Sequence, residues 1–203
     1  MKNLALFDFD GTITTKDTFT PFILYAVESK RLAVGRVVLS PLIVAYKLGV
    51  LSPSRIRRSI VRFGFRGRLE AQVRDAGLEY SRSRLRRVVR ARALERIRWH
   101  QTQGDEVVVV SASLDVYLQD WCRELGVELI CTELEQDQGV LTGRYRNGDC
   151  SGKEKAHRIQ QRYDLRSFAD VYAYGDTPED DAMLALATKR FYRWRELSDV
   201  GSK

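Results

Sequence analysis

Cysteine and histidine are scarce in this chain of 203 residues, which contains three cysteines and two histidines. Cys122, Cys131 and Cys150 are too few and too widely spaced for a disulfide framework or a cysteine-rich zinc site. We expect His100 and His157 to be ordinary helix-surface residues, which leaves no histidine-based metal site or triad. An odd number of cysteines without a recognisable export signal is typical of a reducing compartment, so the sequence predicts a cytoplasmic protein.

Long hydrophobic runs are also lacking. The longest uncharged apolar run lies between Arg36 and Lys47, about half of the ~20 residues that span a bilayer. The formal net charge is +7, and its basic excess is confined to one segment. Residues 51–100 contain fifteen arginines, no lysine and four acidic residues, whereas residues 101–203 contain thirteen basic and nineteen acidic residues. The positive charge therefore characterises one segment of the chain.

Three short apolar runs, at residues 4–9, 107–110 and 171–174, predict buried β-strands because each ends at a turn signal. Helical patterns separate these runs, at about 84–102, 114–125, 152–163 and 178–188. Strands without polar alternation that are separated by helices are typical of an α/β fold. We therefore expect a parallel sheet with helices on both faces.

Residues 15–83 do not follow this rhythm, because their apolar helical stretches are interrupted by proline and glycine and lead into the arginine-rich segment. We expect a helical cap there, inserted after the first strand of a core formed by residues 1–14 and 84–203. Within residues 128–149, an apolar run at 128–131 and two turn signals predict hairpin strands.

Acidic and hydroxyl side chains gather at the ends of the three predicted strands. Asp8 and Asp10 end the first strand, and Ser111 follows the second. Asp176 and Asp180 follow the third. Ligands bind at this edge of an open α/β sheet. Carboxylates held together repel one another unless a cation lies between them, and an all-oxygen donor set suits Mg²⁺. The pattern predicts a Mg²⁺ site that also binds a substrate phosphate.

These segments resemble the four motifs of the haloacid dehalogenase (HAD) superfamily of phosphohydrolases. The resemblance is carried by Asp-Phe-Asp-Gly-Thr-Ile at 8–13, Ser111, Lys155 and Gly-Asp-X₃-Asp at 175–180. Inserts between the first two motifs are the superfamily's first cap type. The strings around these motifs make the chain most similar to the phosphoserine-phosphatase-like branch, subfamily IB. The resemblance implies a Rossmann-like core with a type-1 helical cap, and a Mg²⁺-dependent phosphomonoester hydrolase that acts through an aspartyl-phosphate.

The resemblance also implies roles for the acidic residues. Asp8 would attack phosphorus, and Asp10 would protonate the leaving oxygen and then deprotonate water. The implied metal ligands are Asp8, Asp10 through its backbone carbonyl, Asp176 and Asp180. Asp181 is the alternative to Asp180, but it does not match the motif spacing and lies ~100° further around a helix.

Hydroxyl, amide and lysine groups would hold the phosphate. The resemblance implies that Ser111 and Lys155 bind the phosphoryl oxygens, with Thr12 and Ala112 in the same phosphate-binding site. Lys153 is the alternative to Lys155. Both lysines lie in the first turn of a predicted helix, where a positive charge opposes the helix dipole and is unfavourable. We therefore expect at least one of the two lysines to be there because the function requires it.

The substrate is less well defined by the sequence. Phosphoserine phosphatases carry a glutamate nine positions after the nucleophile, and this chain has Asp17 there, which is one methylene shorter. Asp17 can contact the substrate or cap the helix that begins near Thr18. The departure weakens a phosphoserine assignment. A lipid phosphate such as phosphatidylglycerophosphate, which some subfamily IB relatives use, is the alternative.

The apolar stretch 19–51 and the arginine-rich stretch 55–98 leave three hypotheses open. The apolar residues can pack within the cap beneath a solvated arginine face. They can instead contact an anionic membrane, which would place the protein at its inner face. Nucleic acid is the least favoured partner, because the run Tyr80–His100 has eight arginines but only Trp99 as a further aromatic residue after Tyr80. No obligate protein partner is indicated. Rival classes are a phosphotransferase or mutase, a phospho-receiver switch and an inactive basic adaptor.

Overall fold

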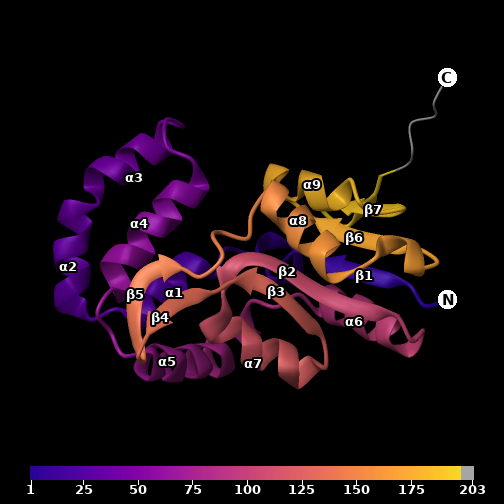
Figure 1. The fold of residues 1–203 in the computed structure, drawn as a ribbon, viewed down its shortest axis with the longest axis horizontal. Helices are drawn as coiled ribbons and strands as arrows, with labels where there is room; N and C mark the ends of the chain where they lie inside the picture. Colours follow the sequence, from indigo (N-terminus) through magenta and orange to yellow (C-terminus); the bar gives the residue numbers. More distant parts are fainter. Residues whose placement is uncertain (198–203) are drawn as a thin grey trace.

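The computed structural model describes residues 1–197 as an α/β core with a group of helices beside it (Figure 1). The strands are β1 (Leu4–Phe7), β2 (Glu106–Leu114), β3 (Glu128–Thr132), β4 (Leu134–Asp137), β5 (Val140–Tyr145), β6 (Val171–Gly175), β7 (Lys189–Tyr192) and β8 (Arg195–Glu196). The helices are α1 (Phe19–Ala26), α2 (Ser29–Val38), α3 (Ser40–Lys47), α4 (Pro53–Phe65), α5 (Glu70–Ser83), α6 (Ala91–Thr102), α7 (Asp115–Leu125), α8 (Lys153–Arg162) and α9 (Asp181–Leu184). Shorter helical turns span Phe9–Ile13, Leu85–Arg87, Leu165–Ser167 and Pro178–Asp180.

Six strands form one sheet in the order β3-β2-β1-β6-β7-β8. All neighbours are parallel except β7 and β8, which are antiparallel. Leu4 and Leu6 of β1 lie in the core on one face, and Ala5 and Phe7 lie in the core on the other. Burial on both faces explains the absence of polar alternation in the strand sequences. The predicted fold class, a parallel α/β sheet covered by helices on both sides, is confirmed.

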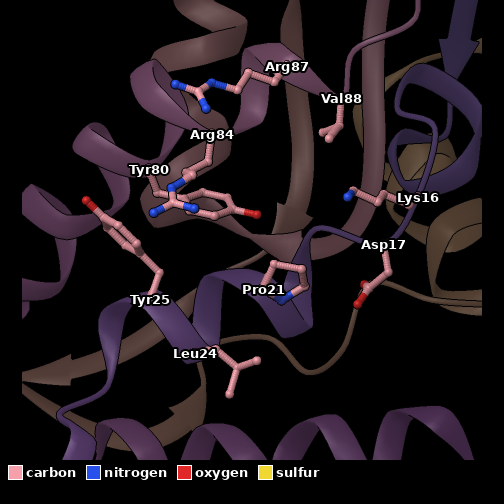
Figure 2. A pocket seen from close by; sticks show the side chains of 9 residues that line it. All are labelled: Lys16, Asp17, Pro21, Leu24, Tyr25, Tyr80, Arg84, Arg87 and Val88. Carbon is pink, nitrogen blue, oxygen red and sulfur yellow. The ribbon is translucent and has the colours of Figure 1, made fainter.

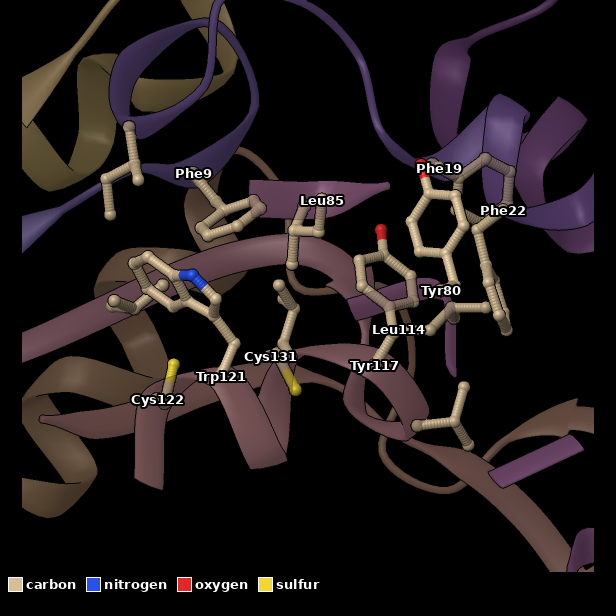
Figure 3. Packing of buried hydrophobic residues seen from close by; sticks show 14 of the residues in the cluster. Phe9, Phe19, Phe22, Tyr80, Leu85, Leu114, Tyr117, Trp121, Cys122 and Cys131 are labelled. Carbon is tan, nitrogen blue, oxygen red and sulfur yellow. The ribbon is translucent and has the colours of Figure 1, made fainter. Parts of the chain in front are cut away.

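One hydrophobic cluster joins the sheet to the inserted helices (Figure 3). Phe9 packs edge-on against Trp121 of α7 at a centroid distance of 5.2 Å. Phe22 of α1 lies 4.7 Å from the ring of Tyr117, also on α7. Helix α1 is therefore packed onto the same core as the sheet, because its apolar face is buried against α7.

His100 is a buried residue, so the prediction that it lies on a helix surface is wrong. Its side chain has no exposed area, and its two ring nitrogens contact Asp105 at 2.8 Å and the hydroxyl of Tyr174 at 2.9 Å. Burial lowers the pKa of His100, although Asp105 opposes the shift. The sequence pattern could not show this, because Tyr174 lies on β6, 74 positions further along the chain.

The helix predicted at 84–102 is interrupted. A short turn ends at Arg87, Val89 pairs with Thr14 in an isolated antiparallel bridge, and α6 begins only at Ala91. Arg90 donates hydrogen bonds to the carbonyls of Thr14 at 2.9 Å and Gly11 at 3.2 Å. The segment between Arg87 and Ala91 is therefore not helical, because it binds the loop that follows β1.

The segment at 128–131 is not a hairpin strand as predicted. It forms β3, the parallel edge strand of the main sheet, in register with β2 from Val108. The only hairpin in the described segment between β3 and α8 is β4–β5, which lies beside α4 and α5 (Figure 1). Strand β5 also exchanges backbone hydrogen bonds with the α4–α5 connection, where Gly67 donates to Leu141 and Leu141 donates to Arg68, both at 2.8 Å.

Helices α1 to α5 lie between β1 and β2 in the chain, and α2, α3 and α4 project furthest from the sheet (Figure 1). The predicted division into a core at 1–14 and 84–203 and a cap at 15–83 stays a prediction. Among residues 1–197, no helix combines the length and apolar character needed to cross a bilayer.

Candidate active site

A cavity of about 400 Å³ lies at the carboxyl ends of the neighbouring strands β1, β2 and β6. The parallel register places these ends together, and the amide of Asp8 donates to the carbonyl of Tyr174 at 2.9 Å. All predicted site residues except Thr12 line the cavity: Asp8, Asp10, Asp17, Ser111, Ala112, Lys155, Asp176 and Asp180. Thr12 is buried and does not line the cavity, and its hydroxyl donates to Asp176 at 3.1 Å.

Lys155 connects two of the carboxylates. Its ammonium group contacts Asp8 at 2.5 Å and Asp180 at 2.6 Å, and all three side chains are buried. Burial lowers the pKa of Lys155, but the two carboxylates outweigh it and the net shift is upward. The alternatives considered from sequence, Lys153 and Asp181, are exposed. The structure therefore brings Lys155 and Asp180 into the cavity and leaves their neighbours outside.

Two glycines allow the acidic loops to approach one another. Gly11 has φ of +90°, and a Cβ atom there would lie 2.3 Å from a carboxylate oxygen of Asp176. A Cβ atom on Gly175 would lie 2.6 Å from the Cβ of Asp180. Any side chain at either position would push a carboxylate out of the cavity, so these glycines are required by the close packing of the site.

The donor set fits a divalent cation. Carboxylate oxygens of Asp8, Asp176 and Asp180 lie within 4.8 Å of one another. Three carboxylates against the single ammonium of Lys155 leave a charge of −2 when all are ionised. Burial raises the pKa of Asp8 to about 8 and also raises that of Asp176, although Lys155 opposes both shifts. Hard oxygen donors with excess negative charge suit Mg²⁺.

Asp10 is held by groups outside this cluster. Its carboxylate accepts hydrogen bonds from the amide and hydroxyl of Thr18, at 2.7 and 2.6 Å, and from the hydroxyl of Ser113 at 2.5 Å. Burial raises the pKa of Asp10 to about 6, and these hydrogen bonds limit the rise. A carboxyl group with this pKa can both give and take a proton near neutral pH. Thr18 and Ser113 were not identified as site residues from the sequence, because nothing in their spacing shows that they face Asp10.

Asp180 orders the loop that carries Asp176. One of its oxygens accepts hydrogen bonds from the amides of Asp176 and Thr177, both at 3.0 Å, and the other contacts Lys155. Thr177 also forms a capping box with Asp180 at the start of the turn Pro178–Asp180. The buried carboxylate thereby fixes the positions of Asp176 and Lys155 relative to each other.

Asp17 caps a helix, as one of its two predicted roles requires. Its carboxylate oxygens accept hydrogen bonds from the amides of Phe19 and Thr20, both at 3.1 Å, at the start of α1. These bonds satisfy amides that have no partner within the helix. The same carboxylate lines the cavity, so contact with substrate stays a prediction.

Arg57 reaches the cavity from α4 and was not identified from the sequence. Its guanidinium contacts Asp149 at 3.0 Å and Glu179 at 3.1 Å. Burial lowers the pKa of Arg57, but the two acids outweigh it and the net shift is upward. A single arginine in an arginine-rich stretch carries no distinguishing signal. The ion pairs nevertheless tie an inserted helix to the loop after β6, next to the acidic cluster.

Comparison with known proteins agrees with this geometry. A sequence profile of the haloacid dehalogenase-like hydrolases matches residues 5–185. The chain belongs to this family. It is 31% identical over 194 residues to Protein CicA of Caulobacter vibrioides (strain NA1000 / CB15N), which covers 94% of this chain and 85% of the relative. The predicted HAD membership is confirmed.

Solved structures share the fold at lower sequence identity. A protein of unknown function from Bordetella pertussis Tohama I is similar with a TM-score of 0.80 and 23% identity, over 95% of this chain and 90% of that one. A substrate-bound phosphoserine phosphatase is similar with a TM-score of 0.65 and 21% identity, over 95% and 86% of the two chains. The HAD core fold of this hydrolase is thus common to enzymes named as phosphatases.

Proposed function

We propose that this HAD-like hydrolase is a Mg²⁺-dependent phosphomonoester hydrolase that acts through an aspartyl-phosphate. The observation that carries the proposal is the pairing of two carboxyl groups of different character in one cavity. Asp8 lies against the ammonium group of Lys155 in the acidic cluster, where a bound cation would favour its ionised form, whereas the carboxylate of Asp10 is held apart by Thr18 and Ser113. One group is placed to attack and the other to transfer protons.

The reaction proceeds in two displacements at phosphorus. In the first, a carboxylate oxygen of Asp8 forms a bond to phosphorus while the ester oxygen leaves and takes the proton of Asp10. In the second, Asp10 removes a proton from water, whose oxygen attacks phosphorus and releases inorganic phosphate and the Asp8 carboxylate. Each step is easier than a single attack by free water. Asp10 returns to its protonated state after each cycle.

Lys155 and Ser111 bind the phosphoryl oxygens in this proposal. Ser111 accepts a hydrogen bond from the amide of Ser113 at 3.0 Å, so its own O–H is available to donate. Lys155 supplies a positive charge where negative charge spreads over the transferring group. The amide of Ala112 adds a further donor at the cavity wall, and Thr12 keeps Asp176 in place.

The residues that would hold Mg²⁺ are Asp8, Asp176, Asp180 and the backbone carbonyl of Asp10. The ion supplies positive charge beside the transferring phosphoryl group. Asp10 is assigned through its carbonyl because its carboxylate is already bound by Thr18 and Ser113. Asp180 would offer the oxygen that faces Lys155, since its other oxygen is bound by loop amides.

Removal of the metal provides the test of this proposal. Hydrolysis of p-nitrophenyl phosphate in the presence of Mg²⁺ should fall by about a hundredfold or more when EDTA is added, and should return with excess Mg²⁺. Ca²⁺ at the same concentration serves as control for ionic strength, because it prefers more ligands at longer distances. Full activity in EDTA, or no hydrolysis with Mg²⁺, contradicts the proposal. The match to hydrolases over residues 5–185 favours this function over a phospho-receiver or an inactive adaptor.

A second, narrower candidate is action on a lipid phosphate at an anionic membrane, and one observation favours it. Apolar side chains are exposed on α2, α3 and the turn after α3, a surface we call the apolar tip: Val34, Val37, Val38, Val44, Tyr46, Leu48 and Val50. Exposed Lys30, Arg36 and Lys47 lie within the same segment. Apolar residues flanked by basic ones are typical of helices that bind the interface of an anionic bilayer.

Vesicle sedimentation tests the membrane candidate. Binding to phosphatidylglycerol vesicles should exceed binding to phosphatidylcholine vesicles and should fall steeply with salt. The double variant Val37→Glu/Val38→Glu should bind at least about tenfold more weakly, since two apolar side chains are lost from the bilayer contact. Leu197→Glu, on an exposed leucine beyond the sheet edge, is the matched control. Membrane docking by this surface is ruled out if wild type, Val37→Glu/Val38→Glu and Leu197→Glu bind vesicles equally. It is also ruled out if the double variant differs from wild type only in its oligomeric state.

A further inference from the structure

A second cavity, of about 490 Å³, adjoins the catalytic one. The two cavities share Lys16 and Asp17 in their linings, so they meet at the loop between Thr14 and Thr18. Figure 2 shows Lys16 and Asp17 on one side of the second cavity and Tyr25, Tyr80 and Leu24 facing it from the helices. Its volume is within the usual range for small-molecule sites. Nothing in the proposed hydrolytic step uses it.

The walls of this cavity are apolar and aromatic. Tyr25 of α1 and Tyr80 of α5 lie with ring centroids 5.6 Å apart at an angle of 52°. Tyr80 is held in place because its hydroxyl donates to the carbonyl of Thr18 at 3.2 Å and its ring is buried. Leu24 is 53% exposed, so it offers apolar surface that the protein leaves uncovered. Such walls bind a flat or hydrocarbon group.

The rim carries basic side chains without acidic partners. Among residues 1–197, no ion pair is formed by Lys16, Arg84 or Arg87. The nearby Arg86, by contrast, pairs with Glu124. Asp17, the acid in the lining, already accepts two helix amides. Arg84 lies over the ring of Tyr25, 5.9 Å from its centroid. The lining therefore has three basic side chains against one acid, beside an apolar wall, which is an arrangement suited to an organic anion.

We propose that this cavity binds the leaving group of the substrate, and that this group combines an apolar or aromatic part with a second anionic group. The inference rests on the proposed phosphatase function. In an in-line displacement the ester oxygen leaves on the side of phosphorus opposite Asp8, and the adjoining cavity begins at the loop that borders the site. The apolar part packs against Tyr25, Tyr80 and Leu24, while Arg84 and Arg87 bind the second anion.

Two matched esters test this inference. Naphthyl phosphate offers the apolar part alone, and carboxynaphthyl phosphate, with the carboxylate on the distal ring, adds the second anion. Wild type should hydrolyse the carboxylated ester with about tenfold higher kcat/KM than the plain one, a difference equivalent to about 1.4 kcal/mol. In Arg84→Gln/Arg87→Gln this preference, taken as the ratio of the two kcat/KM values measured on the same variant, should disappear.

Arg86→Gln is the matched control, because Arg86 lies in the same short helical turn, Leu85–Arg87, but pairs with Glu124 and does not line the cavity. It should keep the full preference. The inference is overturned if wild type shows no preference, if the double variant keeps it, or if Arg86→Gln removes it equally. Arg84 and Arg87 are surface residues outside the catalytic cavity, so the double variant should fold normally, and circular dichroism checks this.

Binding separates failure of this inference from failure of the proposed function. Calorimetric titration of Asp8→Asn with each ester should show about tenfold tighter binding of carboxynaphthyl phosphate, which Arg84→Gln/Arg87→Gln in the same background removes. Inactivity toward both esters combined with this binding pattern rejects the phosphatase and keeps the anion site. Activity without the binding preference keeps the phosphatase and rejects the anion site.

Two sources of such a leaving group are distinguished by further probes. A nucleoside bisphosphate carries an aromatic base and a second phosphate, whereas a short-chain glycerolipid phosphate with an internal phosphodiester carries hydrocarbon and a second anion. The ester whose kcat/KM falls about tenfold in Arg84→Gln/Arg87→Gln identifies the chemical class of the leaving group. If neither ester is hydrolysed with a dependence on these arginines, the second-anion assignment is wrong for both classes.

Discussion

Asp8→Asn should lower kcat/KM for p-nitrophenyl phosphate by at least about four orders of magnitude, because an amide oxygen cannot form the phosphoenzyme bond. Burial already raises the pKa of Asp8 to about 8, so a neutral isostere costs less desolvation than the ionised carboxylate. The variant should therefore fold. Its melting temperature in the absence of metal should stay close to that of wild type.

The neighbouring acid Asp181 gives a matched control. Asp181→Asn makes the same chemical change at an exposed position next to Asp180, outside the cavity. We expect it to retain activity within about twofold. Mass spectrometry after rapid acid quench should detect a phosphate adduct on wild type and none on Asp8→Asn. Substantial hydrolysis by Asp8→Asn would exclude Asp8 as nucleophile, whatever the metal dependence.

Asp10→Asn should lower steady-state turnover by about a thousandfold and change the shape of the reaction time course. p-Nitrophenolate is a good leaving group that needs little protonation, so the first displacement should still occur. Water can then no longer be deprotonated efficiently. We expect a burst of one p-nitrophenolate per enzyme followed by slow release of phosphate, measured by stopped-flow absorbance. A uniform loss without a burst would contradict the assignment of Asp10 to the hydrolysis of the phosphoenzyme.

The pH profile provides a second readout on Asp10. With an alkyl phosphate, whose leaving oxygen needs the proton, kcat/KM should fall as pH rises through about 6, because burial holds the pKa of Asp10 there. The sign follows from the need for protonated Asp10 in the first displacement. Asp10→Asn should remove this decline and leave a low, flatter profile. A decline that persists unchanged in the variant belongs to another group.

In the arginine-rich segment, counting charges located the arginines but could not show what each one contacts. The sequence located fifteen arginines in residues 51–100 and left their role open between a solvated face and a binding surface. In the structure these arginines make different kinds of contact. Arg57 joins α4 to the active-site loops, Arg90 binds the loop after β1, and Arg86 forms an exposed surface pair. Local sequence cannot separate these roles, because each is set by partners far along the chain.

The sequence by itself determined the α/β fold and the acidic cluster, because strand ends and motif spacing are local properties. Asp8 and Asp176 each follow an apolar strand, and the parallel order of those strands brings them together. Only the tertiary structure decided which groups control the chemistry of these residues. Thr18 and Ser113 around Asp10, and the cavity beside Tyr80, arise where β2 and the inserted helices meet the loop after β1. Burial and hydrogen bonding set the pKa of a carboxyl group, and both depend on the packing of distant segments.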